Sequence, residues 1–241
     1  MASPDPADRD LARLRGEYAR RRADSSRRYS AFNPSHLYAL HQRQRALTAL
    51  LRRYGIVSLA GKRILEVGCG DGGVLIEYLT YGAALPALFG IDLLEDRLGD
   101  ARQRAPCARL ACANGQALPF PDAAFDLVLQ YTAFSSILDD RIKSDMASEM
   151  RRVLRPTGHI IWYDFWLNPT NPQTRGIRQP EMRRLFPNCE IAVSRVTLAP
   201  PIARRLVPIS WIAAAALERL TLLNTHFLAL ITPRPSQKSN G

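Results

Sequence analysis

The chain has few cysteines, and none lies in a metal-binding or redox pattern. Four cysteines occur in 241 residues, namely Cys69, Cys107, Cys112 and Cys189. No two of them form a Cys-x-x-Cys pair, and no histidines accompany them at zinc spacing. We therefore expect buried, reduced thiols and no bound metal.

Long apolar runs are also absent. No run reaches the roughly 18 uncharged residues that a membrane span needs, and the first six residues lack the apolar core of a secretory signal. The stretch 207–231 is strongly apolar, but Glu218, Arg219 and Asn224 interrupt it. We expect a cytoplasmic protein in which this stretch forms an inserted helix packed on the domain. An interfacial helix that contacts a membrane is the alternative.

The charge balance is strongly basic, with a formal net charge of +11. Such a charge suits an acidic partner, for example nucleic acid, anionic lipid or a phosphorylated substrate. It equally suits an arginine-rich proteome, and we favour this explanation because the basic residues are spread over several segments. The sequence does not indicate an oligomeric state.

The most informative stretch is residues 63–73, RILEVGCGDGG. Its apolar half predicts a strand, four glycines follow within six residues, and Val74 opens a helical pattern. Glycine allows a tight turn and a close approach of ligand to main chain, and we expect free N–H groups at the start of the helix. Gly68, Gly70 and Gly73 also fit G-x-G-x-x-G, so the glycines alone leave NAD and S-adenosylmethionine open.

A carboxylate follows at the end of the next predicted strand. Asp92 ends the apolar run 88–91, twenty residues after Gly72. A carboxylate at this position accepts hydrogen bonds from both ribose hydroxyls of a nucleoside. Leu93, the next residue, is expected to pack on the adenine.

From residue 62 the pattern alternates strand and helix, which predicts a doubly wound α/β sheet. The predicted strands are 63–67, 88–91, 108–111, 125–129, 159–163, 190–198 and 226–231. The predicted helices between them run to about 81, then over 94–104, 141–154 and 207–223. We assign residues 59–232 to one domain, with a helical insertion at about 199–223 before the last strand.

The segments outside this domain have other characters. Residues 1–30 are basic and expected to be partly disordered, as is the tail 233–241. Residues 31–58 are expected to form a helical lid, with Asn33 as the capping residue and Pro34 in the first turn of its helix. Tyr29, Phe32 and Tyr38 are candidates for covering the ligand cleft.

These motifs resemble a known family. Glu66, Gly68, Gly70 and Gly72 match the acidic-x-Gly-x-Gly-x-Gly motif of the class I S-adenosylmethionine-dependent methyltransferases. Residues 114–126 resemble the small-molecule subgroup related to the ubiquinone and menaquinone C-methyltransferases, whose pattern has Asp where Asn114 stands. The resemblance implies a seven-stranded, mostly parallel Rossmann-like sheet and S-adenosyl-L-methionine as cofactor, with S-adenosyl-L-homocysteine as product. It implies cofactor contacts from Glu66, Gly68, Cys69, Gly70, Asp92, Leu93, Asn114, Gly115, Gln116 and Gln130.

The acceptor side is less defined. The Asn/Asp-Pro-Pro-Tyr/Phe motif of adenine-methylating enzymes is absent after strand 125–129, and so is the Pro-Cys of cytosine-C5 enzymes. We therefore do not expect a nucleic-acid substrate. Tyr131 is expected to line the acceptor side. Asp164 ends strand 159–163, and the family's antiparallel last strand would bring His226 to the same edge, where a carboxylate could orient an imidazole base.

We therefore predict methyl transfer from S-adenosylmethionine to a small or lipid-linked metabolite, at oxygen, with His226, Asp164 and Tyr131 as the catalytic residues. One alternative is C-methylation of a quinone or isoprenoid precursor, which needs no base. An alternative of another class is a non-catalytic module with a cofactor-binding fold that binds RNA or a partner protein.

Overall fold

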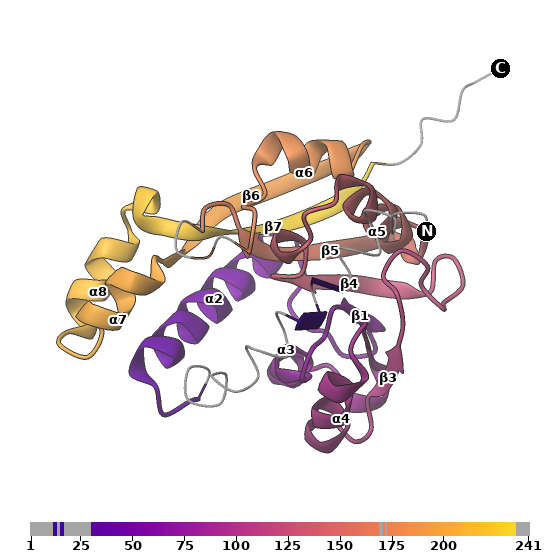
Figure 1. Cartoon of the computed structure of the whole chain (residues 1–241), viewed down its shortest axis with the longest axis horizontal. Coiled ribbons are helices and arrows are strands. Elements are labelled where there is room, and N and C mark those ends of the chain that lie inside the picture. The colour runs from indigo at the N-terminus through magenta and orange to yellow at the C-terminus, as the bar shows by residue number, and fades with distance from the viewer. Residues whose placement is uncertain (1–11, 14, 17–29, 169–170, 172, 235–241) are drawn as a thin grey trace, which may run out of the picture.

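A seven-stranded sheet forms the centre of the molecule (Figure 1). The computed structural model describes residues 12–13, 15–16, 30–168, 171 and 173–234. Its strands are β1 (Ile64–Val67), β2 (Leu88–Asp92), β3 (Arg109–Cys112), β4 (Phe125–Tyr131), β5 (Leu154–Phe165), β6 (Cys189–Leu198) and β7 (Asn224–Pro233). They lie in the order β3-β2-β1-β4-β5-β7-β6, and only the β5–β7 and β6–β7 pairs are antiparallel. This confirms the predicted mostly parallel, doubly wound sheet.

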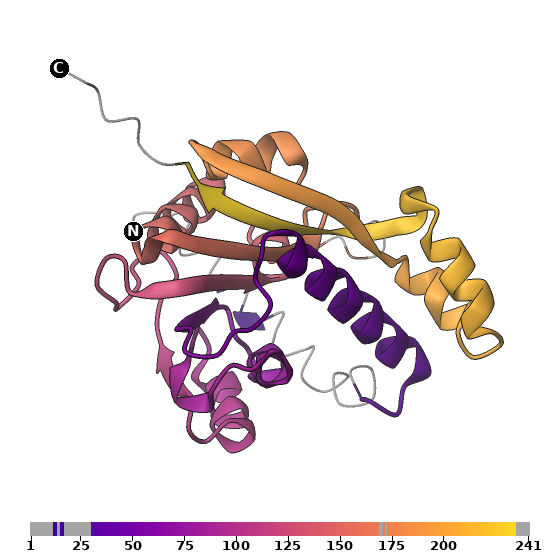
Figure 2. The ribbon, with the colours of Figure 1, turned by 180° about the vertical axis from the view of Figure 1, so that it is seen from behind.

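Helices cover both faces of the sheet (Figures 1 and 2). One face packs on α2 (Pro34–Arg53), α3 (Gly73–Glu77) and α4 (Glu95–Arg104). The other packs on α5 (Asp140–Arg152) and α6 (Gln179–Leu185). All residues of β1, β2 and the first eight of β7 are buried, as expected for strands covered on both sides.

Local signals set the ends of several helices. Asn33 caps α2 by accepting hydrogen bonds from the N–H groups of Ser35 and His36, and Pro34 occupies the first turn. Asp139 caps α5 in the same way. After the glycine turn, however, α3 has only five residues and continues as a 3-10 helix, Tyr78–Tyr81.

The C-terminal third differs most from the prediction. Within the expected helix 207–223 the structure has only α8 (Trp211–Glu218), which Ser210 caps, and a short 3-10 helix, Thr221–Leu223. A separate helix, α7 (Pro200–Leu206), ends before this range begins. We call residues 199–223 the helical hairpin. Strand β7 starts at Asn224, two residues before the predicted start.

Some predictions fall on residues outside the described ranges. These are the partly disordered state of the first residues, the role of Tyr29 and the disordered state of the tail from 235. Within the described ranges, no helix is both long and apolar enough to cross a membrane.

Candidate active site

The glycine turn between β1 and α3 has the backbone shape that the sequence demands. Gly68, Gly70 and Gly72 have φ of 78°, 56° and 73°, in the left-handed region that favours glycine. A Cβ on Gly68 would lie 3.1 Å from the Cβ of Ala133, so this turn passes close to the loop after β4.

The turn is held from inside the protein. The N–H groups of Gly68 and Cys69 both donate to the carbonyl of Ile91 at 2.8 Å. The N–H of Gly70 donates to Asp92 Oδ2 at 2.8 Å. The N–H groups of these three residues of the turn are therefore already hydrogen-bonded within the protein, and the turn can accommodate a ligand through close approach to its main chain.

Asp92 lies at the end of β2 beside the turn, with its side chain almost fully buried. Besides Gly70, it accepts a hydrogen bond from the N–H of Leu94 at 3.0 Å. A carboxylate offers about four acceptor positions, so both hydrogen bonds leave capacity for hydroxyl groups. Arg97 Nη1 lies 3.5 Å from Asp92 Oδ2, and a Cβ on Gly70 would collide with the Arg97 guanidinium. Arg97 thus covers the turn in this structure.

Glu66 is buried one residue before the end of β1. Its Oε2 has no hydrogen-bond partner among the described residues, and burial, with help from Glu77, raises its pKa well above the usual range. A buried carboxyl oxygen without a donor is costly unless a ligand supplies one.

These features fit S-adenosylmethionine. A Cβ on Gly68 would crowd Ala133, Glu66 has a buried oxygen without a partner among the described residues, and Asp92 offers a carboxylate at the strand end. Glu66 and Asp92 would accept hydrogen bonds from the bound cofactor. Arg97, which is about one-third exposed, would have to turn away from Gly70.

Leu93 and the loop after β3 lie beyond the same strand ends. Leu93 is half-buried. Asn114 is exposed, and its Oδ1 accepts a hydrogen bond from the N–H of Gln116 at 3.0 Å. A Cβ on Gly115 would lie 2.9 Å from Met146 Cε, so this glycine packs against α5. Their contacts with a cofactor stay predictions.

Gln130 organises the loop after β4 and is itself fully buried. Its Oε1 accepts a hydrogen bond from the N–H of Ala133 at 2.8 Å, and its Nε2 donates to Asp164 Oδ2 at 3.0 Å. Asp164 Oδ2 also accepts from the N–H of Ser135 at 3.1 Å. In the same loop Thr132 has φ of 56°, a strained value for a β-branched residue. The predicted cofactor contact of Gln130 stays untested.

The predicted contact between Asp164 and His226 is wrong. In the antiparallel register Asp164 pairs with Phe227, whereas His226 pairs with Phe165, so their side chains lie on opposite faces of the sheet. Asp164 instead serves the loop after β4, and burial raises its pKa to about 6.

His226 and Tyr131 lie together in a buried cluster beneath α2. The His226 ring stacks on Tyr163 with the ring centres 4.7 Å apart, and the Arg43 guanidinium lies 5.1 Å from the Tyr131 ring and 5.2 Å from the Tyr163 ring. The hydroxyl of Tyr131 is hydrogen-bonded to that of Tyr78 at 2.9 Å. Burial lowers the pKa of His226 to about 3, and the charge of Arg43 acts in the same direction. His226 is therefore a weak base here.

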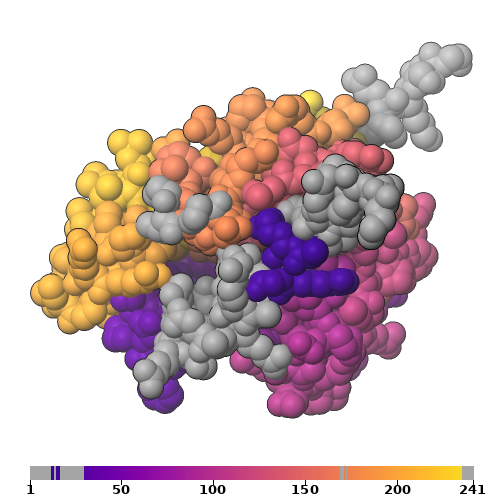
Figure 3. All heavy atoms as spheres, in the orientation of Figure 1, coloured from indigo at the N-terminus to yellow at the C-terminus, as the bar shows by residue number. Residues whose placement is uncertain are grey.

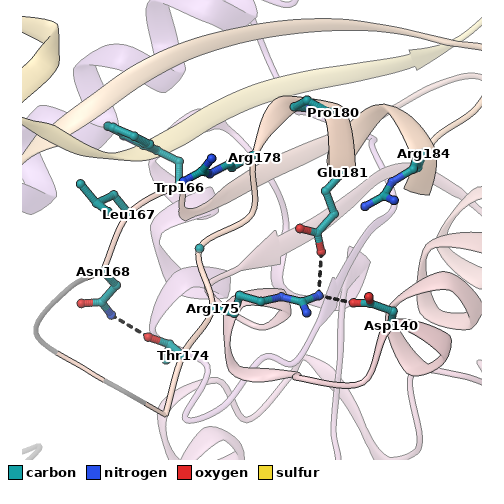
Figure 4. A pocket seen from close by; sticks show the side chains of 11 residues that line it. Asp140, Trp166, Leu167, Asn168, Thr174, Arg175, Arg178, Pro180, Glu181 and Arg184 are labelled. Carbon is teal, nitrogen blue, oxygen red and sulfur yellow. Dashed lines mark hydrogen bonds and ion pairs between the residues drawn. The ribbon is translucent and has the colours of Figure 1, made fainter.

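A cavity of about 590 Å³ opens beyond the carboxyl end of β5 (Figure 4). Trp166 and Leu167 give it an apolar wall, and three arginines also line it: Arg175, Arg178 and Arg184. Arg175 forms ion pairs with Asp140 and Glu181. The N–H of Arg175 donates to the carbonyl of Ser135 at 2.8 Å. The loop after β4 therefore contacts the glycine turn through Ala133 and the cavity wall through Ser135.

Sequence reasoning missed several of these residues. The sequence could have indicated that Arg97 lies near Asp92, since it follows Asp92 by five residues in the first turn of α4. Nothing in the sequence distinguishes Arg43, because basic residues are common in a basic amphipathic helix. The arginines of the cavity come together only through the fold.

Comparisons with known proteins agree with this arrangement. A family model described as a methyltransferase domain matches residues 64–158. The chain is 42% identical over 106 residues to a fatty-acid O-methyltransferase of Mycolicibacterium smegmatis, covering 43% of this chain and 37% of that protein. It is 36% identical over 117 residues to a phthiotriol/phenolphthiotriol dimycocerosates methyltransferase of Mycobacterium tuberculosis, covering 48% and 41%. The chain thus matches about two fifths of these relatives' length.

Solved structures share the fold. A 1,6-didemethyltoxoflavin-N1-methyltransferase of Burkholderia thailandensis superposes with a TM-score of 0.62 at 16% identity, over 97% of this chain and 94% of that one. A geranyl diphosphate C-methyltransferase of Streptomyces coelicolor does so with a TM-score of 0.57 at 17% identity, over 84% of each. Residues 64–158 of this chain are a methyltransferase domain, and the sheet has the fold of the class I S-adenosylmethionine-dependent methyltransferases. The placement of the chain in the ubiquinone-related subgroup stays a prediction.

Proposed function

We propose that this protein methylates an oxygen of a lipid-linked acceptor, and that the acceptor group is a carboxylate. The observation that carries the proposal is the loop after β4, which contacts the glycine turn on one side and the arginine-lined cavity on the other. The apolar wall of Trp166 and Leu167 suits an acyl chain, and Arg178 and Arg184 suit its anionic end. The fatty-acid O-methyltransferase relative supports the same acceptor class.

The chemistry favours a carboxylate over an alcohol. Bound S-adenosylmethionine supplies an electrophilic methyl group: the acceptor oxygen forms an O–C bond while the S–C bond breaks, and the sulfur keeps the electron pair. A carboxylate is already ionised at neutral pH and loses no proton, whereas an alcohol needs a base. His226, with its pKa near 3, and Asp164, which is hydrogen-bonded to Gln130 and Ser135, are poorly suited to that task.

The residues then have distinct roles. Glu66 and Asp92 bind the cofactor, and Gln130 and Asp164 hold the loop after β4 in place. The cavity orients the acceptor oxygen toward the methyl group, which is the main contribution a protein makes to such a displacement.

The test uses the full chain, S-adenosylmethionine with a tritiated methyl group, and three acceptor classes: long-chain fatty acids, long-chain alcohols and prenyl diphosphates. We expect label in the fatty-acid reaction, released as methanol by mild alkali because a methyl ester forms. Alkali-stable label on a prenyl diphosphate would favour C-methylation. Cofactor binding without labelling of any acceptor would favour the non-catalytic module.

A matched pair of variants tests the cavity. Arg184 lines it, and the neighbouring exposed Arg183 does not. We expect Arg184→Gln to raise the KM for a fatty acid about tenfold, the scale of one charge-assisted contact, while Arg183→Gln leaves it unchanged. Equal KM values for both variants and the wild type would place the acceptor elsewhere.

A further inference from the structure

The helical hairpin has an inner side that packs and an outer side that does not. Its inner residues Ala203, Val207 and Ala214 are buried with Tyr38 of α2 and Leu198 of β6. The hydroxyl of Ser35 donates to the carbonyl of Ala203 at 3.3 Å, and the Tyr38 ring meets the Trp211 ring edge-on. The hairpin is therefore held firmly on the domain, at one end of the molecule (Figures 1 and 3).

The outer side is apolar. Five of the nine large exposed apolar residues of the described chain fall in the fourteen-residue stretch 209–222. The exposed fractions are Ile209 83%, Trp211 41%, Ile212 85%, Leu220 56% and Leu222 79%. Exposed apolar residues gathered in this way mark a contact surface.

The hairpin is also cationic. Arg204, Arg205 and Arg219 are exposed on the hairpin. Its one acidic residue, Glu218, accepts a hydrogen bond from the Tyr38 hydroxyl and forms an ion pair with Arg45. Apolar side chains and arginines that form no ion pair with any described residue match a surface with an anionic boundary and an apolar interior. A two-fold contact between copies would instead bring like charges together.

We propose that the outer side of the helical hairpin docks on a membrane surface that carries anionic phospholipid. Ile209, Ile212, Leu220 and Leu222 enter the boundary between headgroups and acyl chains, and the arginines contact lipid phosphates. With only eight residues in α8, the hairpin lies on the membrane and does not cross it. This docking is independent of the identity of the methyl acceptor.

Flotation of the full chain with vesicles tests the proposal. We expect binding to vesicles of phosphatidylcholine with phosphatidylglycerol, and much weaker binding to phosphatidylcholine alone. The double variant Ile212→Ser/Leu222→Ser should lower the partition coefficient at least tenfold, because two apolar anchors are lost without a change of charge. Arg204→Gln and Arg205→Gln should each lower it about fivefold.

Two matched variants serve as controls. Val57→Ser removes an apolar side chain that is 84% exposed away from the hairpin, and Arg183→Gln removes an exposed charge on α6. Both should bind vesicles like the wild type. All variants should keep their affinity for S-adenosylhomocysteine, which shows that the domain is intact whether or not the acceptor proposal holds.

Two results would overturn the proposal. One is unchanged vesicle binding by the hairpin variants, which would assign any lipid affinity to another part of this basic chain. The other is an absence of vesicle binding together with a dimer in analytical ultracentrifugation that Ile212→Ser abolishes, which would make the outer side a contact between copies.

Discussion

Asp92 offers the sharpest test of the cofactor site. In Asp92→Ala the N–H groups of Gly70 and Leu94 lose their acceptor, and each buried N–H left unpaired costs about 1–3 kcal/mol of unfolding free energy. The cofactor loses the acceptor for its ribose hydroxyls as well. Losing charge-assisted hydrogen bonds weakens binding by about 1.5–3 kcal/mol, so calorimetry should show a Kd raised about 10- to 150-fold.

A thermodynamic cycle that combines Asp92→Ala with ligands lacking one ribose hydroxyl tests whether Asp92 contacts the ribose directly or only supports the loop. The wild type should bind 2′-deoxy- and 3′-deoxy-S-adenosylhomocysteine more weakly than the parent compound, whereas Asp92→Ala should bind all three alike. Additive losses would refute the contact between Asp92 and the ribose. Asp92→Asn, which keeps one acceptor oxygen, provides a folded variant should the alanine protein unfold. Asp122→Ala is the control, since Asp122 lies on the surface and its one ion pair among the described residues is with Arg152.

Three further predictions concern neighbouring groups. Arg97→Ala should leave the cofactor Kd unchanged or lower it by up to about fivefold, because the ion pair with Asp92 is partly exposed and its loss uncovers the turn; a tenfold higher Kd would show that Arg97 binds the cofactor. His226 has a pKa of about 3 when folded against 6.5 when unfolded, so its stabilising effect is complete above pH 6.5 and declines below it. Relative to His226→Phe, the wild type should lose up to about 2 kcal/mol of urea unfolding free energy between pH 6.5 and about 5, and parallel pH curves would contradict this. RNA retention on filters should be weak and fall steeply with salt; tight, sequence-selective retention at physiological salt would reopen a nucleic-acid role.

The fold and the position of Asp92 beside the glycine turn were predictable because their signals are local. The glycine turn and the strand-end carboxylate each need only a few consecutive residues, and the structure places Gly70 and Asp92 in direct contact. The acceptor side depends on register instead. Strand β7 pairs His226 with Phe165, and a shift of one residue would have placed His226 on the same face as Asp164. No short-range pattern specifies that register.

The positions of individual side chains were a second feature that the sequence alone could not predict. The sequence places Arg97 in the first turn of α4, but only the packed structure shows that its guanidinium lies over Gly70. The start of α8 could have been predicted, since Ser210 is a recognisable helix-capping residue.

In the function that we propose, the strained loop after β4 makes the cofactor site and the acceptor site thermodynamically dependent on each other. Any movement of Ala133 or Ser135 that one ligand favours changes the other ligand's site. By linkage, the factor by which the cofactor changes acceptor affinity equals the factor by which the acceptor changes cofactor affinity. The unusual backbone of Thr132 stores about 1–3 kcal/mol, which is the size of ordinary coupling free energies. Release of that strain would suffice to make the two ligands bind in a preferred order.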